Sequence, residues 1–132
     1  MSSVGTLLTS LQGWAFLKIP TTGKTTSQNT KDTCEGLGYS PTCYRNDEHQ
    51  YNDDNCVKPL KGDSVYTLYQ VGAAVCPENE NPTYWWTCKP MYGICQYMAN
   101  YNSGSAHCSD EAGSTVGSNS LVNKWSSCTF KL

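Results

Sequence analysis

Eight cysteines constrain this chain more than any other feature of its sequence. Of its 132 residues, 38% are hydrophobic and 15% are charged, which is a modest apolar supply for the core of one domain. Disulfides compensate for a small core because they restrict the unfolded chain, and they persist in oxidising compartments. We therefore expect four disulfides in one small extracellular domain. The cysteines are Cys34, Cys43, Cys56, Cys76, Cys88, Cys95, Cys108 and Cys128.

The cysteines fall into two sets of four with similar spacing. Gaps of 8, 12 and 19 residues separate the first four, and gaps of 6, 12 and 19 separate the second four. The sets span residues 34–76 and 88–128 and suggest an internal duplication, which would favour disulfides within each set. Coincidence is the alternative, because the side chains between matched cysteines agree poorly. None of the gaps has the short spacing typical of paired zinc ligands.

Charge and hydropathy exclude two classes of partner. The formal net charge is -2, with nine basic residues against eleven acidic ones, and the basic residues are scattered. Nucleic acid is therefore not expected as a partner. No run approaches the roughly 18 apolar residues that span a bilayer, so membrane insertion is not expected. The N-terminus also lacks the pattern of a signal peptide, so a secreted form would have lost a leader.

Local patterns predict an α+β fold, with one short helix packed on a mainly antiparallel sheet and long loops held by disulfides. Residues 13–20 have the aromatic and branched content of a strand. A hydroxyl within residues 25–27 can cap a helix over residues 28–35, which Gly36 or Gly38 would end. An almost all-β fold is the alternative.

Further segments are assigned from alternation and polarity. The polar, turn-rich segments 40–62 and 100–120 predict loops, the first of them held by Cys43 and Cys56. Residues 64–71 carry β-forming side chains on both faces and predict a central strand. Further strands are expected over residues 83–88, 93–98 and 121–130.

The first twelve residues differ from the domain expected over residues 13–132. They are uncharged and rich in Ser, Thr and Gly, which is typical of an arm or linker. A loose tail has no need of apolar side chains, so we also consider an arm that docks on its own domain or on a neighbouring chain. In a fibre subunit, this arm would add a strand to the next copy's sheet edge. The apolar residues are Val4, Leu7, Leu8 and Leu11.

The sequence carries no recognisable catalytic set. His49 and His107 lie in polar segments without a motif around them, and the carboxylates are dispersed. We therefore expect solvated loop histidines and no enzymatic activity. A cluster of hard oxygen ligands makes calcium the single cofactor considered, although its spacing is not that of an EF-hand. The candidate ligands are Asn52, Asp53, Asp54 and Asn55.

Aromatic residues are the strongest signal after the cysteines. Several of them lie among Asn, Ser and Gly, a combination that suits sugar faces or protein surfaces. On a strand Trp85 and Trp86 would point to opposite faces, so we expect one in the core and the other exposed. The candidate ligand-binding residues are Tyr84, Trp85, Trp86, Tyr97 and Tyr101.

Two parts of the sequence carry a resemblance to a known module. The first comprises residues 13–23, GWAFLKIPTTG, and residues 32–35, DTCE, and the second comprises residues 91–105 with the closing Trp125 and Cys128. They resemble the opening and the second half of a cysteine-rich extracellular module found in large surface and secreted proteins of marine invertebrates. The resemblance implies an extracellular, repeated, non-enzymatic building block, and it implies no ligand.

These observations favour a non-enzymatic extracellular module with a structural or adhesive role. Its partners would be copies of itself or other extracellular proteins, and self-assembly into a fibre is the most specific form of this hypothesis. The alternative is a lectin-like domain that binds glycans through its aromatic residues, with or without calcium. A secreted toxin or protease inhibitor that presents the loop at residues 78–83 is a third hypothesis.

Overall fold

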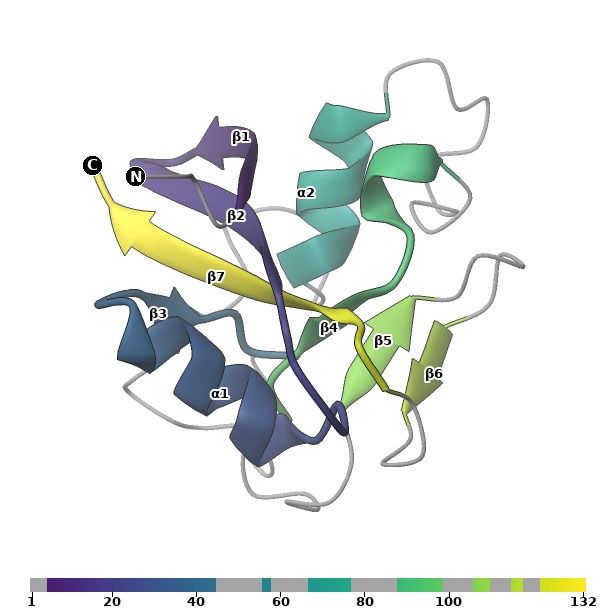
Figure 1. Ribbon diagram of the computed structural model, residues 1–132. Coiled ribbons are helices and arrows are strands. Elements are labelled where there is room, and N and C mark those ends of the chain that lie inside the picture. The colour runs from purple at the N-terminus through teal and green to yellow at the C-terminus, as the bar shows by residue number, and fades with distance from the viewer. Residues whose placement is uncertain are drawn as a thin grey trace.

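The computed structural model describes residues 5–44, 56–57, 67–76, 88–98, 106–109, 115–117 and 122–132. The fold is a small disulfide-rich α+β fold, as predicted, with helices α1 and α2 on opposite sides of the long strand β7 (Figure 1). The elements are β1 (Thr6–Leu11), β2 (Trp14–Pro20), α1 (Ser27–Gly36), β3 (Ser40–Pro41), α2 (Thr67–Val75), the 3-10 helix η2 (Lys89–Met91), β4 (Ile94–Gln96), β5 (His107–Ser109), β6 (Thr115–Gly117) and β7 (Trp125–Lys131).

The strands lie in the order β1-β2-β7-β4-β5-β6, and β3 also pairs with β7. Among the described pairs, β4 and β7 run parallel and the others antiparallel. The first long strand thus lies beside the last one, with Trp14 opposite Lys131 and Pro20 opposite Trp125. In the part of the chain that the structure describes, no helix has the length and hydropathy needed to cross a membrane.

The N-terminal segment is built into the sheet as one arm of a hairpin. β1 pairs with β2 across the two-residue turn at Gln12 and Gly13. These two residues have φ values of 50° and 85°, the left-handed conformation that such a tight turn requires. Residues 6–11 therefore dock on their own domain. This is one of the two docked arrangements considered for the arm.

A bulge in β1 explains how this strand directs two leucines three residues apart toward one core. The register shifts between Leu7 and Thr9, so β1 has one more residue than the facing part of β2. In a regular strand, Leu8 and Leu11 would point to opposite faces. The extra residue turns both toward the cluster around Phe16.

The larger apolar cluster fills the space between the sheet and α2. The predicted strand over residues 64–71 is wrong from Thr67 onward, because α2 occupies Thr67–Val75. Its buried positions include Leu68, Val71 and Gly72, which share one face at helical spacing. Over so few residues, the apolar positions of an alternating strand and those of a helix overlap, so the pattern that predicted a strand also fits this helix. The buried members of the cluster are Phe16, Val57, Leu68, Val71, Cys76, Met91 and Ile94.

Helix α1 packs on the other side of the sheet through hydroxyls and sulfur. The predicted helix and cap are confirmed: the Thr26 Oγ1 accepts a hydrogen bond from the Asn29 N–H at 3.0 Å. The buried positions of α1 are Ser27, Thr30 and Cys34, so this helix contributes almost no aliphatic surface. Polar contacts and a disulfide must therefore hold it in place.

Other predicted segments differ in detail from the structure. The strands expected at residues 13–20, 93–98 and 121–130 are confirmed as β2, β4 and β7, with shorter or shifted bounds. The two predicted loops contain short strands, β3 in the first and β5 and β6 in the second. Of the strand expected over residues 83–88, residues 83–87 lie outside the described residues, and Cys88 caps η2 instead.

All eight cysteines form disulfides, and the pairing within sets is wrong for four of them. Two bonds stay within a set and two join the sets. One of the joining bonds forms because α1 packs on β7, and the other links the end of α2 to the start of η2. The bond between α1 and β7 closes the largest covalent loop. The disulfides are Cys34–Cys128, Cys43–Cys56, Cys76–Cys88 and Cys95–Cys108.

Candidate functional site

The predicted assembly residues do not form one apolar face. Leu8 and Leu11 pack against the core under α2, whereas the Leu7 side chain is 62% exposed. Val4 lies outside the described residues. Two of the three leucines of β1 thus pack the hairpin against the core, and the third is exposed to solvent.

The outer edge of β1 is the most distinctive surface of the sheet. β1 is terminal in the strand order, so none of the described strands pairs with its outer side. Its sequence TLLTSL contains no charged residue and no proline. Exposed strand edges in proteins are commonly protected by lysine or proline, because their backbone N–H and C=O groups can pair with another chain. The edge of β1 lacks both kinds of protection.

A strip of apolar side chains extends from this edge across the sheet. Leu7 lies opposite Leu17, which lies opposite Cys128. Farther along β7, Phe130 is 37% exposed and its ring stacks on Tyr39 with the centroids 5.7 Å apart. The Leu7–Leu17 pair therefore lies on the same face of the sheet as the buried Cys128, on the side that α1 covers.

Most of the predicted ligand-binding residues cannot be placed. Tyr84, Trp85, Trp86 and Tyr101 lie outside the described residues, and so do the predicted calcium ligands at residues 52–55. Within the described segments, no three or more His, Cys, Asp or Glu side chains gather as a metal site would require. The one predicted aromatic residue that the structure places is Tyr97.

Tyr97 follows β4 and lies beside a small cluster that Tyr44, Gln96 and His107 form. Its N–H donates to the Thr42 carbonyl at 2.9 Å, and its carbonyl accepts from the Tyr44 N–H at 2.7 Å. The Lys31 Nζ lies 5.3 Å from the centroid of the Tyr97 ring, within the range of a cation–π contact. The Tyr44 ring lies 3.9 Å from the His107 ring, at a tilt of 40°.

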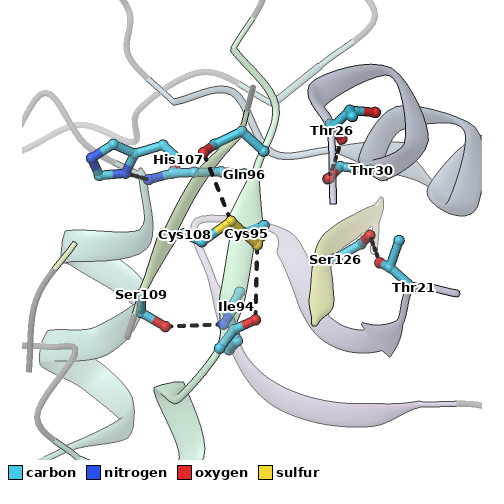
Figure 2. Close-up of a disulfide and its surroundings, with 12 residues drawn as sticks. Thr21, Thr26, Thr30, Ile94, Cys95, Gln96, His107, Cys108, Ser109 and Ser126 are labelled. Carbon is cyan, nitrogen blue, oxygen red and sulfur yellow. Dashed lines mark hydrogen bonds between the residues drawn. A yellow bond between two sulfur atoms is a disulfide. The ribbon is translucent and has the colours of Figure 1, made fainter. Parts of the chain in front are cut away.

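Sequence reasoning missed two members of this cluster, Gln96 and His107. His107 was expected in a solvated loop, but it lies on β5 with its side chain half-buried. The Gln96 side chain is fully buried, with Nε2 3.3 Å from the His107 Nδ1, and the two side chains meet at one end of the disulfide in Figure 2. No local sequence pattern predicts this pair, because Gln96 and His107 become neighbours only through the register of β4 and β5.

Beside the cluster, the Cys95–Cys108 disulfide joins residues that lie directly opposite each other on β4 and β5. Both half-cystines are fully buried. Near the disulfide, the Ser109 Oγ accepts from the Ile94 N–H at 2.9 Å (Figure 2). The same hydroxyl donates to the Met91 carbonyl. The bond and this hydroxyl bridge fix the two strands and the turn before them.

Comparisons with protein family models, with curated proteins and with solved structures found no match. The residues and contacts described above are therefore the basis for assigning a function. Of the two surfaces, the β1 edge is defined by a whole strand, whereas the aromatic cluster is defined by a few side chains.

Proposed function

We propose that this protein is a non-enzymatic extracellular module with a structural or adhesive role, and that it self-associates through its N-terminal hairpin. The observation that carries the proposal is the outer strand β1, which is uncharged, free of proline and terminal in the strand order. Such an edge is a ready template for pairing with another chain.

The arrangement of the disulfides supports an extracellular mechanical role. Cys34–Cys128 ties α1 to β7, and Cys76–Cys88 ties the end of α2 to the start of η2. Four disulfides in a chain of this size are typical of secreted and cell-surface domains. The resemblance of residues 13–23 and 91–105 to an invertebrate extracellular module implies the same location. Cross-linked layers of this kind suit a building block that must keep its shape under load.

Self-association is tested by measuring the mass of the oxidised protein over a range of concentrations. Mass photometry and analytical ultracentrifugation are expected to show defined oligomers whose population rises with concentration. Negative-stain microscopy then distinguishes small oligomers from fibres. A strictly monomeric protein throughout the micromolar range would contradict the proposal.

A lectin-like function is the second candidate, and the aromatic cluster is the observation that favours it. The rings of Tyr44 and His107 contact each other beside Gln96, whose buried Oε1 accepts no hydrogen bond in the described part of the chain. The backbone of Tyr97 is hydrogen-bonded to that of Tyr44. Rings beside an amide are a common arrangement for binding sugar faces.

Glycan binding is tested on an array, with and without EDTA. The lectin-like function predicts binding that Tyr44→Ala or Tyr97→Ala reduces at least about tenfold. Tyr39→Ala, which removes a ring that stacks on Phe130, is the control and is expected to keep the binding. Absence of binding by the native protein, or equal loss in all three variants, would exclude this cluster as a glycan site.

A further inference from the structure

We propose that the partner of the β1 edge is a second copy of this chain, bound by antiparallel pairing of β1 with β1. Two six-residue edges then join two sheets into one continuous sheet. This inference rests on the proposed self-association and names its interface, its partner and its symmetry.

The backbone of the hairpin presents a donor and an acceptor on the outer edge of β1, near the turn. In a hairpin with a two-residue turn, the flanking pair, here Leu11 and Trp14, exchanges hydrogen bonds between the strands. Alternation along the ladder then turns the N–H and C=O of Ser10 away from β2. The Ser10 side chain is exposed, so it does not cover these groups. An antiparallel copy supplies the matching carbonyl and amide from the outer edge of its own β1.

The charge distribution favours a copy of the same chain over a charged partner. Residues 5–17 contain no charged side chain. The first charge, Lys18, is directed elsewhere: its Nζ lies 4.6 Å from the centroid of the Trp125 ring and donates to the Pro90 carbonyl at 3.3 Å. Two identical neutral edges can therefore meet without like-charge repulsion, whereas an acidic or basic partner would find no opposite charge on β1.

Exchange of the arm between copies is a less favourable route to the same pairing. A swapped β1 would have to open the tight turn at Gln12 and Gly13, whose positive φ values already suit the hairpin. It would also have to withdraw Leu8 and Leu11 from the core under α2. Edge pairing needs neither change, because it uses the strand where it lies.

The symmetry of this interface predicts a dimer. Each copy offers the same strand, so the contact is two-fold and closes on itself. A fibre would require a second interface at another surface. The apolar strip that begins at Leu7 and Leu17 continues across the new junction and adds side-chain contact to the backbone pairing.

The backbone contact is tested with a matched pair of substitutions at one position. Ser10→Pro removes the outward N–H and places a ring on the edge, whereas Ser10→Ala changes the side chain and keeps the amide. Sedimentation equilibrium is expected to show a dimer dissociation constant raised at least about tenfold by Ser10→Pro and unchanged by Ser10→Ala. Near-UV circular dichroism and thiol titration establish that each variant is folded with four disulfides.

A second pair of substitutions keeps the test valid if Ser10→Pro fails to fold. Leu7→Lys places a like charge in each copy at the interface, and Val122→Lys places it at a residue that is 52% exposed and lies outside the hairpin. Leu7→Lys is expected to weaken the dimer at least about tenfold, with partial recovery in high salt, and Val122→Lys to leave it unchanged. Amide exchange at Ser10 in the native protein is expected to slow as concentration rises.

The outcomes separate this inference from the proposed function. Native oligomers that persist unchanged in Leu7→Lys and Ser10→Pro would overturn β1–β1 pairing and leave self-association standing at another surface. Fibres that survive Leu7→Lys would do the same. A native protein that stays monomeric would overturn both the interface and the proposed self-association.

Discussion

Replacement of Cys34 and Cys128 together by alanine is expected to lower the free energy of unfolding by about 4.5 kcal/mol. This bond joins residues 94 positions apart, the largest covalent loop in the protein. Chain-entropy arguments assign a greater effect to longer loops, because the cross-link removes more conformations from the unfolded chain. Both side chains are fully buried between α1 and β7, where α1 has few apolar contacts of its own.

The control for this prediction is the Cys43–Cys56 bond, which joins residues 13 positions apart. Its replacement by two alanines is expected to cost about 3 kcal/mol. Urea unfolding followed by tryptophan fluorescence measures both variants, with mass spectrometry to verify that the other three disulfides are intact. Equal losses, or a larger loss for the short loop, would show that the closure entropy of the long loop does not dominate the stability of this fold.

Phe16→Ala is expected to destabilise the protein by about 4 kcal/mol. Phe16 lies on β2, is 0% exposed, and sits in the cluster that joins the sheet to α2. Its removal deletes buried apolar surface and leaves a cavity lined by residues that the disulfides and the sheet prevent from closing in. Because small domains have a total stability of about 5–15 kcal/mol, this loss is expected to leave a marginally stable protein.

The second of the chain's two phenylalanines provides a matched control. Phe130 lies on β7, is 37% exposed, and stacks on Tyr39. Phe130→Ala is expected to cost about 1 kcal/mol, because much of its surface is in water before the substitution. Thermal and urea unfolding measure the two variants side by side. Similar losses would mean that the cluster around Phe16 is not the main source of apolar stabilisation.

Several local features of the fold were predictable because neighbouring residues determine them. The strand over residues 14–20 follows from its branched and aromatic content. Helix α1 begins where the Thr26 hydroxyl accepts from the Asn29 N–H, and it is followed by Gly38 with a φ of 81°. The abundance of cysteine likewise predicted a small covalently linked domain with little apolar core.

Helix α2 shows the limit of local pattern reading. Over five or six residues an alternating arrangement and a helical one share many apolar positions, so Tyr69 and Val71 fitted a strand as well as a helix. Burial against the sheet selects the helix, because Leu68, Val71 and Gly72 lie on one helical face beside Phe16. That burial depends on residues far away along the chain.

The candidate surfaces depend even more on the register of the sheet. Leu7 was recognisable as an apolar residue in a polar segment, but its exposure at a sheet edge follows from a bulge and from pairing with β2. The contact between Tyr44 and His107 joins segments that have no sequence motif in common.

The composition of the chain, with many cysteines and few apolar residues, established that it is a small disulfide-rich domain. The pairing of Cys34 with Cys128 came from the three-dimensional fold, because α1 packs on β7 and brings the two residues within bonding distance. Local preferences act over a few residues, whereas strand order and register are selected by the burial of the whole sheet. For this reason β1 can be recognised as an edge strand only once the sheet is assembled.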